Sequence, residues 1–199
     1  MPRKGLLAAA AVAAVLIAAA AAALGSALVD SPDIDKPKTT KSRGFVTFRD
    51  PQAGFSIEHP RAWRRLPAAD TQVRLIVASG GASLLVRTAP LGLRVRPQNL
   101  RSAKKVSDRL VRAVKNVKLL RPAKQVQAGG LPGYLYLYTF KDLASGKRGA
   151  HAHYFLFRGQ AMFTLVFQAL PSTAFAGLAP LFDRISNTFR AQPAGTQQR

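Results

Sequence analysis

Short apolar runs separated by turn residues make up most of the chain after Gly44. Their length and composition are typical of strands, and we expect strands at 44–48, 54–58, 73–78, 82–89, 131–142, 148–159 and 162–168. Pro51 presets φ within a turn and Gly54 tolerates the exit geometry, so the first two runs should form a hairpin. Apolar residues occupy both faces of the later strands, which predicts a sheet covered on both sides.

Two segments have helical periodicity instead. Between residues 100 and 118, apolar residues recur at the i, i+3, i+4 and i+7 spacing of one helical face. The opposite face is cationic, with Asp108 as the one acid, and its basic residues are Arg101, Lys104, Lys105, Arg112 and Lys115. A second helix is expected at 175–189, with Pro180 in the first turn of its main segment, where the missing N–H is harmless.

Strands outnumber helices and are joined by short turns, so we predict an α+β fold. Its form would be an α/β/α sandwich with a central antiparallel sheet of about six or seven strands. One N-terminal transmembrane or signal helix precedes it. The expected organisation is an N-terminal segment at 1–29, a disordered linker at 30–43, the folded domain at 44–190 and a disordered tail at 191–199.

The N-terminal segment has no charged residue from Gly5 to Val29, a run of 25 residues. As a helix this run would be about 37 Å long, enough to cross a hydrocarbon core of about 30 Å. That length favours a retained anchor. A signal peptide cleaved near the small residues Gly25-Ser26-Ala27 is the main alternative, and a buried helix is a weaker one.

The charges around this segment predict its orientation. Arg3 and Lys4 precede it, whereas Asp30, Asp33 and Asp35 follow it. The positive-inside rule therefore puts the N-terminus in the cytoplasm and the domain outside the cell membrane, single-pass or secreted. The polar linker would hold a tethered domain within about 50 Å of the bilayer.

Three short motifs carry a resemblance to a known family. The hairpin ends in the pattern GF-x-I-x-x-P-x-x-W, formed by Gly54, Phe55, Ile57, Pro60 and Trp63. A later strand carries Gly130, Pro132, Tyr134 and Tyr136, and the closing helix carries Phe182, Ile185, Thr188 and Phe189. Together they resemble PsbP-like domains over residues 44–190, although His59 stands where an aromatic residue is more usual.

The resemblance implies an α/β/α sandwich that serves as a docking or accessory module without a shared catalytic centre. The same fold is used by a Ran-binding nuclear import factor and by actinobacterial exported proteins. Within it, we expect Pro60 to end a strand and Trp63 to fold back against the sheet, so the motif is structural.

The charge balance points to an anionic partner. The chain has 30 Lys and Arg against 9 Asp and Glu, a formal net charge of +21. Nucleic acid is not expected, because an exported domain does not meet it and aromatic residues are not interleaved with the basic ones. The absence of cysteine excludes disulfides, thiol catalysis and Cys-ligated zinc.

Few residues suggest catalysis or metal binding. The acids are scattered without a close pair, and none of the common nucleotide, hydrolase or metal motifs occurs, so we expect no enzymatic activity and no cofactor. His151 and His153 lie on one face of a strand and would chelate a metal with a third ligand. The structural alternative is that both are histidines of the sheet core. The tyrosines of 134–138 are interpreted as a core face rather than a ligand platform.

These patterns lead to one functional hypothesis. We expect a membrane-tethered, extracytoplasmic binding domain that docks to a protein or to an anionic envelope component, such as lipid or wall polymer, through its basic helix. The alternative for the basic helix is an ordinary solvated face without a binding role. The second function considered is an exported lipid or small-molecule carrier with a pocket between sheet and helix.

Overall fold

The computed structural model describes residues 44–114, 116–143 and 145–192. The strands are β1 (Phe45–Asp50), β2 (Phe55–Pro60), β3 (Arg64–Arg65), β4 (Val73–Ser79), β5 (Ala82–Val95), β6 (Lys118–Leu119), β7 (Lys124–Ala128), β8 (Leu131–Lys141), β9 (Arg148–Ala169) and β10 (Arg190–Ala191). The helices are α2 (Leu100–Ala113) and α3 (Phe175–Asn187), each preceded by a 3₁₀ turn, η1 (Pro97–Asn99) and η2 (Ser172–Ala174). The expected segments 1–29 and 30–43 lie outside the described residues.

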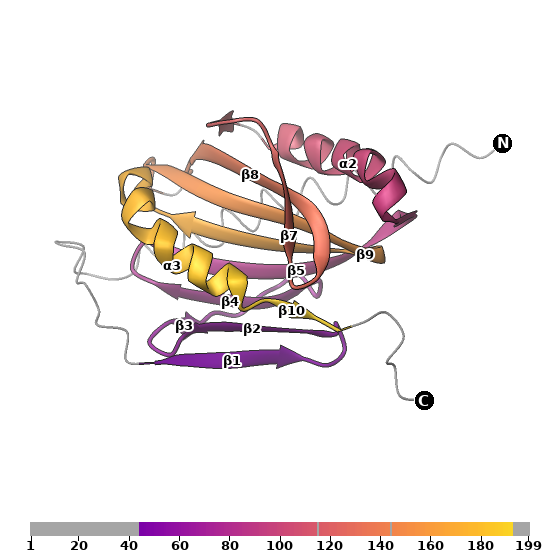
Figure 1. The fold of residues 1–199 in the computed structure, drawn as a ribbon. Helices are drawn as coiled ribbons and strands as arrows, with labels where there is room; N and C mark the ends of the chain where they lie inside the picture. Colours follow the sequence, from indigo (N-terminus) through magenta and orange to yellow (C-terminus); the bar gives the residue numbers. More distant parts are fainter. Residues whose placement is uncertain (1–43, 115, 144, 193–199) are drawn as a thin grey trace.

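Seven strands form the main sheet, and all their pairings are antiparallel. The order is β3-β4-β5-β9-β8-β6, with β7 also paired to β8. Two helices and this sheet confirm the α+β class (Figure 1). No helix among the described residues is long and apolar enough to cross a membrane.

Strand β9 is a hairpin. Its residues 148–156 pair with β8, and its residues 159–169 pair with β5. His151 Nε2 lies 2.8 Å from Gln168 Oε1, although the two residues are 17 positions apart. A straight strand would separate them by about 56 Å, so the chain must double back. It turns at Gly159, whose φ is 57°, which matches the two strands expected on either side of Gly159.

The first hairpin is not part of the main sheet, contrary to the expectation of one central sheet. Strands β1 and β2 instead form a separate three-stranded sheet with β10. The inward residues Phe55 and Ile57 are buried in the core, and the Phe55 ring lies 5.9 Å from that of Phe163 in β9. The hairpin therefore packs face-on against the main sheet, and the unpredicted β10 pairs with the free edge of β2.

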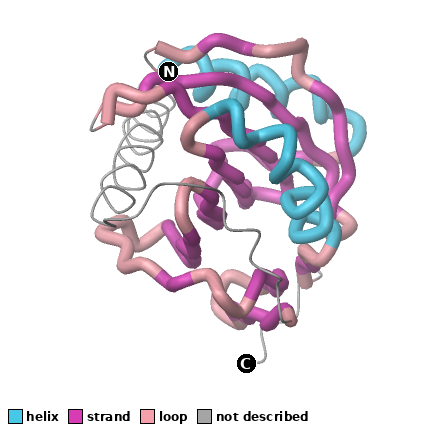
Figure 2. The backbone as a smooth tube through the Cα atoms, turned by 90° about the vertical axis from the view of Figure 1, so that its left-hand side faces the viewer, coloured by secondary structure: helices cyan, strands magenta, loops and turns pink. Residues whose placement is uncertain are grey.

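The helices cover opposite faces of the main sheet (Figures 1 and 2). Helix α2 packs over Tyr134, Tyr136 and Tyr138, and the alternate residues of β8 belong to the other core cluster, beneath α3 and the small sheet. This alternation is the one that the sequence of β8 predicts. Trp63 is 8% exposed within the larger cluster, as expected of a plug against the sheet.

Three boundaries differ from the sequence predictions. Helix α2 ends at Ala113 rather than 118, because Val114 is extended with ψ 120° and the chain turns into the edge strand β6. Strand β5 continues to Val95. Helix α3 begins at Phe175, so Pro180 lies in its interior and not in its first turn. Pro180 is exposed there, so water can solvate the carbonyl that its missing N–H leaves free.

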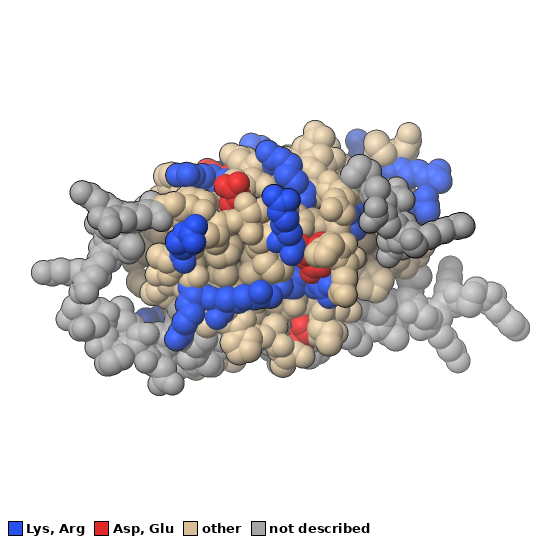
Figure 3. Space-filling view, turned by 90° about the horizontal axis from the view of Figure 1, so that it is seen from below, with Lys and Arg blue, Asp and Glu red and all other residues tan. Residues whose placement is uncertain are grey.

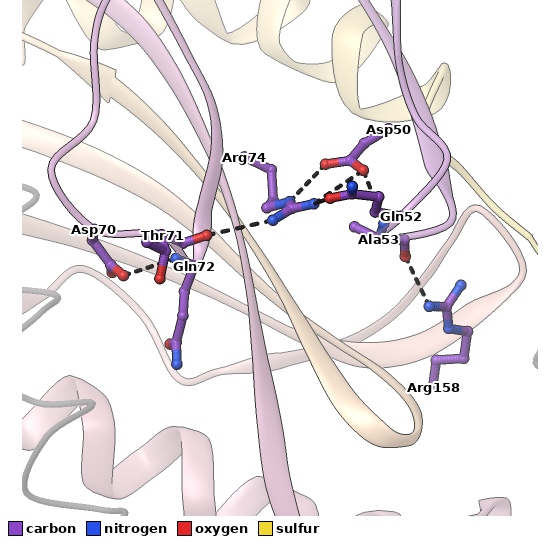
Figure 4. Close-up of polar contacts among 8 residues, drawn as sticks. All are labelled: Asp50, Gln52, Ala53, Asp70, Thr71, Gln72, Arg74 and Arg158. Carbon is purple, nitrogen blue, oxygen red and sulfur yellow. Dashed lines mark hydrogen bonds and ion pairs between the residues drawn. The ribbon is translucent and has the colours of Figure 1, made fainter.

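Polar contacts attach the β1–β2 turn to the main sheet (Figure 4). Arg74 of β4 forms an ion pair with Asp50 at 2.6 Å. From the other side, Arg158 donates hydrogen bonds to the carbonyls of Ala53 at 2.8 Å and Gly54 at 2.9 Å. These contacts fix the position of the small sheet.

Candidate partner-binding site

The outer face of α2 carries a stripe of exposed cations. Arg101, Lys105, Arg109 and Arg112 are all exposed. They follow one another at i, i+4, i+8 and i+11, which places them along one side of the helix over about 16 Å. The buried residues of α2, such as Ala103 and Leu110, occupy the opposite side. We call these four residues the cationic stripe.

Asp108 is the one acid of α2, and its carboxylate is occupied by neighbours. Lys104 Nζ lies 2.8 Å and 2.9 Å from its two oxygens, and the Tyr136 hydroxyl donates to Oδ1 at 2.7 Å. Burial alone would raise the pKa of Asp108, but the hydrogen bonds from Lys104 and Tyr136 outweigh it and lower the pKa. Asp108 therefore stays ionised and fixes α2 to the sheet.

The five predicted binding residues have different positions. Arg101, Lys105 and Arg112 are exposed as expected. Lys104 is half-buried and paired with Asp108, so its charge is partly neutralised. Lys115 lies outside the described residues. The set of binding residues predicted from the sequence did not include Arg109. A helical projection at 100° per residue would have placed it beside Lys105.

Basic residues are not confined to α2. Figure 3 shows Lys and Arg side chains on the face seen from below, with fewer acidic ones between them. Exposed arginines outside α2 include Arg49 of β1, Arg61 and Arg64. The cationic stripe differs from these in its regular spacing on a rigid element.

The space between α2 and the sheet is filled by side chains. Val95, Leu110, Val111 and Met162 form one buried cluster with the tyrosines of β8. Within it, the rings of Tyr136 and Phe155 meet edge to face at 5.5 Å. The tyrosines are thus a core face, as interpreted from the sequence.

His151 and His153 are buried beside Tyr138. The Tyr138 hydroxyl lies 2.8 Å from Nδ1 of His153 and 3.2 Å from Nδ1 of His151. If His151 donates from Nε2 to Gln168, then His153 Nδ1 donates to Tyr138 and Tyr138 donates to His151, a single chain of donors.

Burial keeps both imidazoles neutral. It lowers the pKa of His151 to about 4 and that of His153 well below its usual value. Among the described residues, no group of three His, Asp or Glu is placed to hold a metal ion. Nε2 of His153, Nε2 of Gln168 and Oγ of Ser83 are buried without a partner in that part of the chain. The pair occupies the core between aromatic rings, with the His153 ring stacked on Phe155 at 4.3 Å.

No protein-family model matches the chain, and no curated protein matches it by sequence. Solved structures do match by fold. The solution structure of cyanobacterial PsbP (CyanoP) from Synechocystis superposes with a TM-score of 0.59 at 14% identity, covering 80% of this chain and 99% of that one.

The domain has a PsbP-like fold. Two other solved structures extend the comparison. LpqN, involved in cell envelope biogenesis of Mycobacterium tuberculosis, has a TM-score of 0.54 at 12% identity over 75% of this chain and 91% of its own. The Ran-binding protein Mog1p of Saccharomyces cerevisiae has a TM-score of 0.50 at 8% identity over 75% and 96%.

The motif residues that suggested this PsbP-like fold serve the structure of the domain, in a turn and in the core. Gly54 has a φ of 65° in the turn before β2, and a Cβ there would lie 2.9 Å from the Arg158 guanidinium. Phe55 and Ile57 are buried, and Pro60 ends β2. The predicted resemblance is therefore confirmed as a statement about fold.

Proposed function

We propose that this chain is a membrane-tethered, extracytoplasmic, non-enzymatic binding domain. It docks through the cationic stripe of α2 to an anionic envelope component or to an acidic surface of a protein partner. Export is supported by the uncharged segment from Gly5 to Val29 and by the charges that flank it. The likeness in fold to LpqN, a protein of cell envelope biogenesis, supports a role in the envelope.

One observation supports this docking surface. Arg101, Lys105, Arg109 and Arg112 are exposed on one side of a helix whose only acid is already bound by Lys104 and Tyr136. At an anionic membrane or polymer surface, each such cation contributes about 1 kcal/mol. The stripe would therefore contribute several kcal/mol in total, fading over a Debye length of about 8 Å at physiological salt.

The test is retention of the full chain by isolated envelopes across a salt series. The variant reverses three charges of the stripe, R101E, K105E and R112E. A matched control reverses three exposed arginines elsewhere, R49E, R61E and R64E, and so has the same net charge. We expect the first variant to be released at a lower salt concentration than the wild type, after correction for membrane insertion of residues 1–29, and the second to be released at the same concentration as the wild type. Equal retention of the two variants would contradict the proposal.

A further inference from the structure

Three leucines are the exposed large hydrophobic residues of the described chain. Leu119 is 46% exposed, Leu120 is 55% exposed and Leu143 is 78% exposed. A single exposed leucine needs no explanation, but a group of them in one place marks an interaction surface. Leu119 ends β6, Leu120 follows it, and Leu143 lies in the turn between β8 and β9.

All three leucines lie at one edge of the main sheet. Leu119 is opposite Tyr138, and the Leu120 N–H donates to the Leu137 carbonyl at 2.9 Å. Leu143 follows only five residues after Tyr138, in a turn closed by a hydrogen bond from the Asp142 N–H to the Lys147 carbonyl at 2.8 Å. Five residues of strand span about 17 Å, so Leu143 lies within about that distance of Leu119 along the sheet. We call this region of the sheet the leucine edge.

Exposed cations surround the leucine edge. They are Lys118, Arg121, Lys141, Lys147 and Arg148. Lys118 lies opposite Thr139 in β8, and Arg148 reaches the Thr139 hydroxyl from the other side at 3.5 Å, so cations from three chain segments meet here.

Exposed acids are scarce at this edge. Asp142, the acid closest in sequence, is 2% exposed, and its carboxylate accepts a hydrogen bond from the Ser145 N–H at 2.8 Å. Of the acids in the described part of the chain, Asp183 alone is classed as exposed, and it lies on helix α3. The leucine edge therefore combines exposed apolar side chains with a net positive charge.

We propose that the leucine edge enters the headgroup region of an anionic lipid bilayer, with the five cations against lipid phosphates. Leu119 is the last residue of β6 and Leu120 directly follows it, while Leu143 lies in a turn, so no single strand face presents all three side chains. A protein groove needs one continuous apolar face, whereas a fluid headgroup layer closes around an edge. Basic and apolar residues side by side are the pattern of interfacial membrane binding.

This inference rests on the proposed function, which places the domain beside a membrane. The leucine edge is a different surface from the cationic stripe. The linker 30–43 reaches at most about 50 Å when fully extended. This exceeds the diameter of a domain of this size, which is about 40 Å. A tethered domain can therefore turn its leucine edge toward the bilayer. Helix α2 would remain available for a second partner.

Single-cysteine labelling tests the proposal on the full chain, because the sequence contains no cysteine. Leu120→Cys and Leu143→Cys are labelled with a polarity-sensitive fluorophore, and Thr47→Cys, exposed on the small sheet, is the matched control. Each is bound to vesicles of phosphatidylcholine with or without phosphatidylglycerol. We expect a blue shift and protection from an aqueous quencher at both leucine sites, only with phosphatidylglycerol, and no change at Thr47.

Two further variants separate this proposal from the docking of α2. Lys118→Glu with Lys147→Glu should abolish the blue shift at position 143, whereas the R101E, K105E and R112E variant should preserve it. Aqueous emission at both leucine sites, while the chain co-floats with anionic vesicles, overturns the lipid assignment. So does a shift of the same size at Thr47, or one produced by an acidic protein and not by vesicles.

Discussion

The hydroxyl of Tyr136 in the main sheet donates a hydrogen bond to Asp108 of helix α2 at 2.7 Å. The same hydroxyl lies 2.9 Å from Oγ of Ser107, and the ring is buried. Burial raises the pKa of Tyr136 far above its usual value, so the hydroxyl stays protonated and remains a donor at neutral pH. This contact sets the position of the cationic stripe relative to the sheet.

Tyr136→Phe should therefore destabilise the domain. It removes a hydrogen bond to a charged acceptor, which typically contributes about 1.5 to 3 kcal/mol. Denaturant unfolding followed by circular dichroism measures the loss. Tyr134→Phe is the matched control, since no hydrogen bond to the Tyr134 hydroxyl occurs within the described residues and its removal should change stability by less. Equal effects of the two substitutions would show that the Asp108 contact is unimportant.

The buried histidines should make stability depend on pH. The pKa of His151 is lowered to about 4 in the folded state, against 6.5 when unfolded. Between these values the unfolded chain binds a proton that the folded chain does not, so stability is lost as pH falls from about 6.5 to about 4. His153, with its pKa also lowered, adds to the same trend.

Thermal unfolding measured from pH 7.5 down to pH 4 checks this expectation. His151→Asn should reduce the slope by up to one proton, even if it lowers stability at neutral pH. A slope identical in the His151 variant and the wild type would mean that this imidazole titrates normally in the fold.

Close backbone contact in the main sheet requires glycine at position 133. A Cβ on Gly133 would lie 2.1 Å from the carbonyl oxygen of Phe155 in the neighbouring strand. Gly133→Ala should therefore cost several kcal/mol or prevent folding. Gly177→Ala in α3 has open space around its Cβ and should stabilise by about 0.5 to 1 kcal/mol. Calorimetry of the two variants is the measurement, and a mild effect at position 133 would contradict the tight packing of β8 on β9.

The strands with strong local patterns were the ones that the sequence predicted well. The alternation along β8 indicated both of its buried faces, and Gly54 and Gly159 marked turns that the structure contains. The sequence did not show that β1 and β2 leave the main sheet, because that depends on how Phe55 packs against Phe163, far away in the chain. Strands β3, β6 and β10 have only two residues each, too few to give a pattern.

The sequence predicted the part of the candidate site that depends on local spacing, and not the part that depends on distant contacts. Helical periodicity was enough to find a basic face on α2. The i, i+4 spacing of Lys104 and Asp108 also allows their pairing, which our prediction did not include. The hydrogen bond from Tyr136 to Asp108 comes from 28 residues away, and no local pattern predicts it. The leucine edge was not found, because Leu119 and Leu143 come to the same edge of the sheet only when β6 pairs with β8.

Protease accessibility in intact cells tests the central claim most directly, namely that the folded domain lies outside the cytoplasmic membrane. The full chain carries an epitope after Arg199, and protease is added to cells before and after the envelope is permeabilised, with a cytosolic protein as reference. We predict that the epitope is lost once protease reaches the outer side of the cytoplasmic membrane, while the cytosolic reference stays intact. An epitope that survives until the reference is also cleaved would contradict the account.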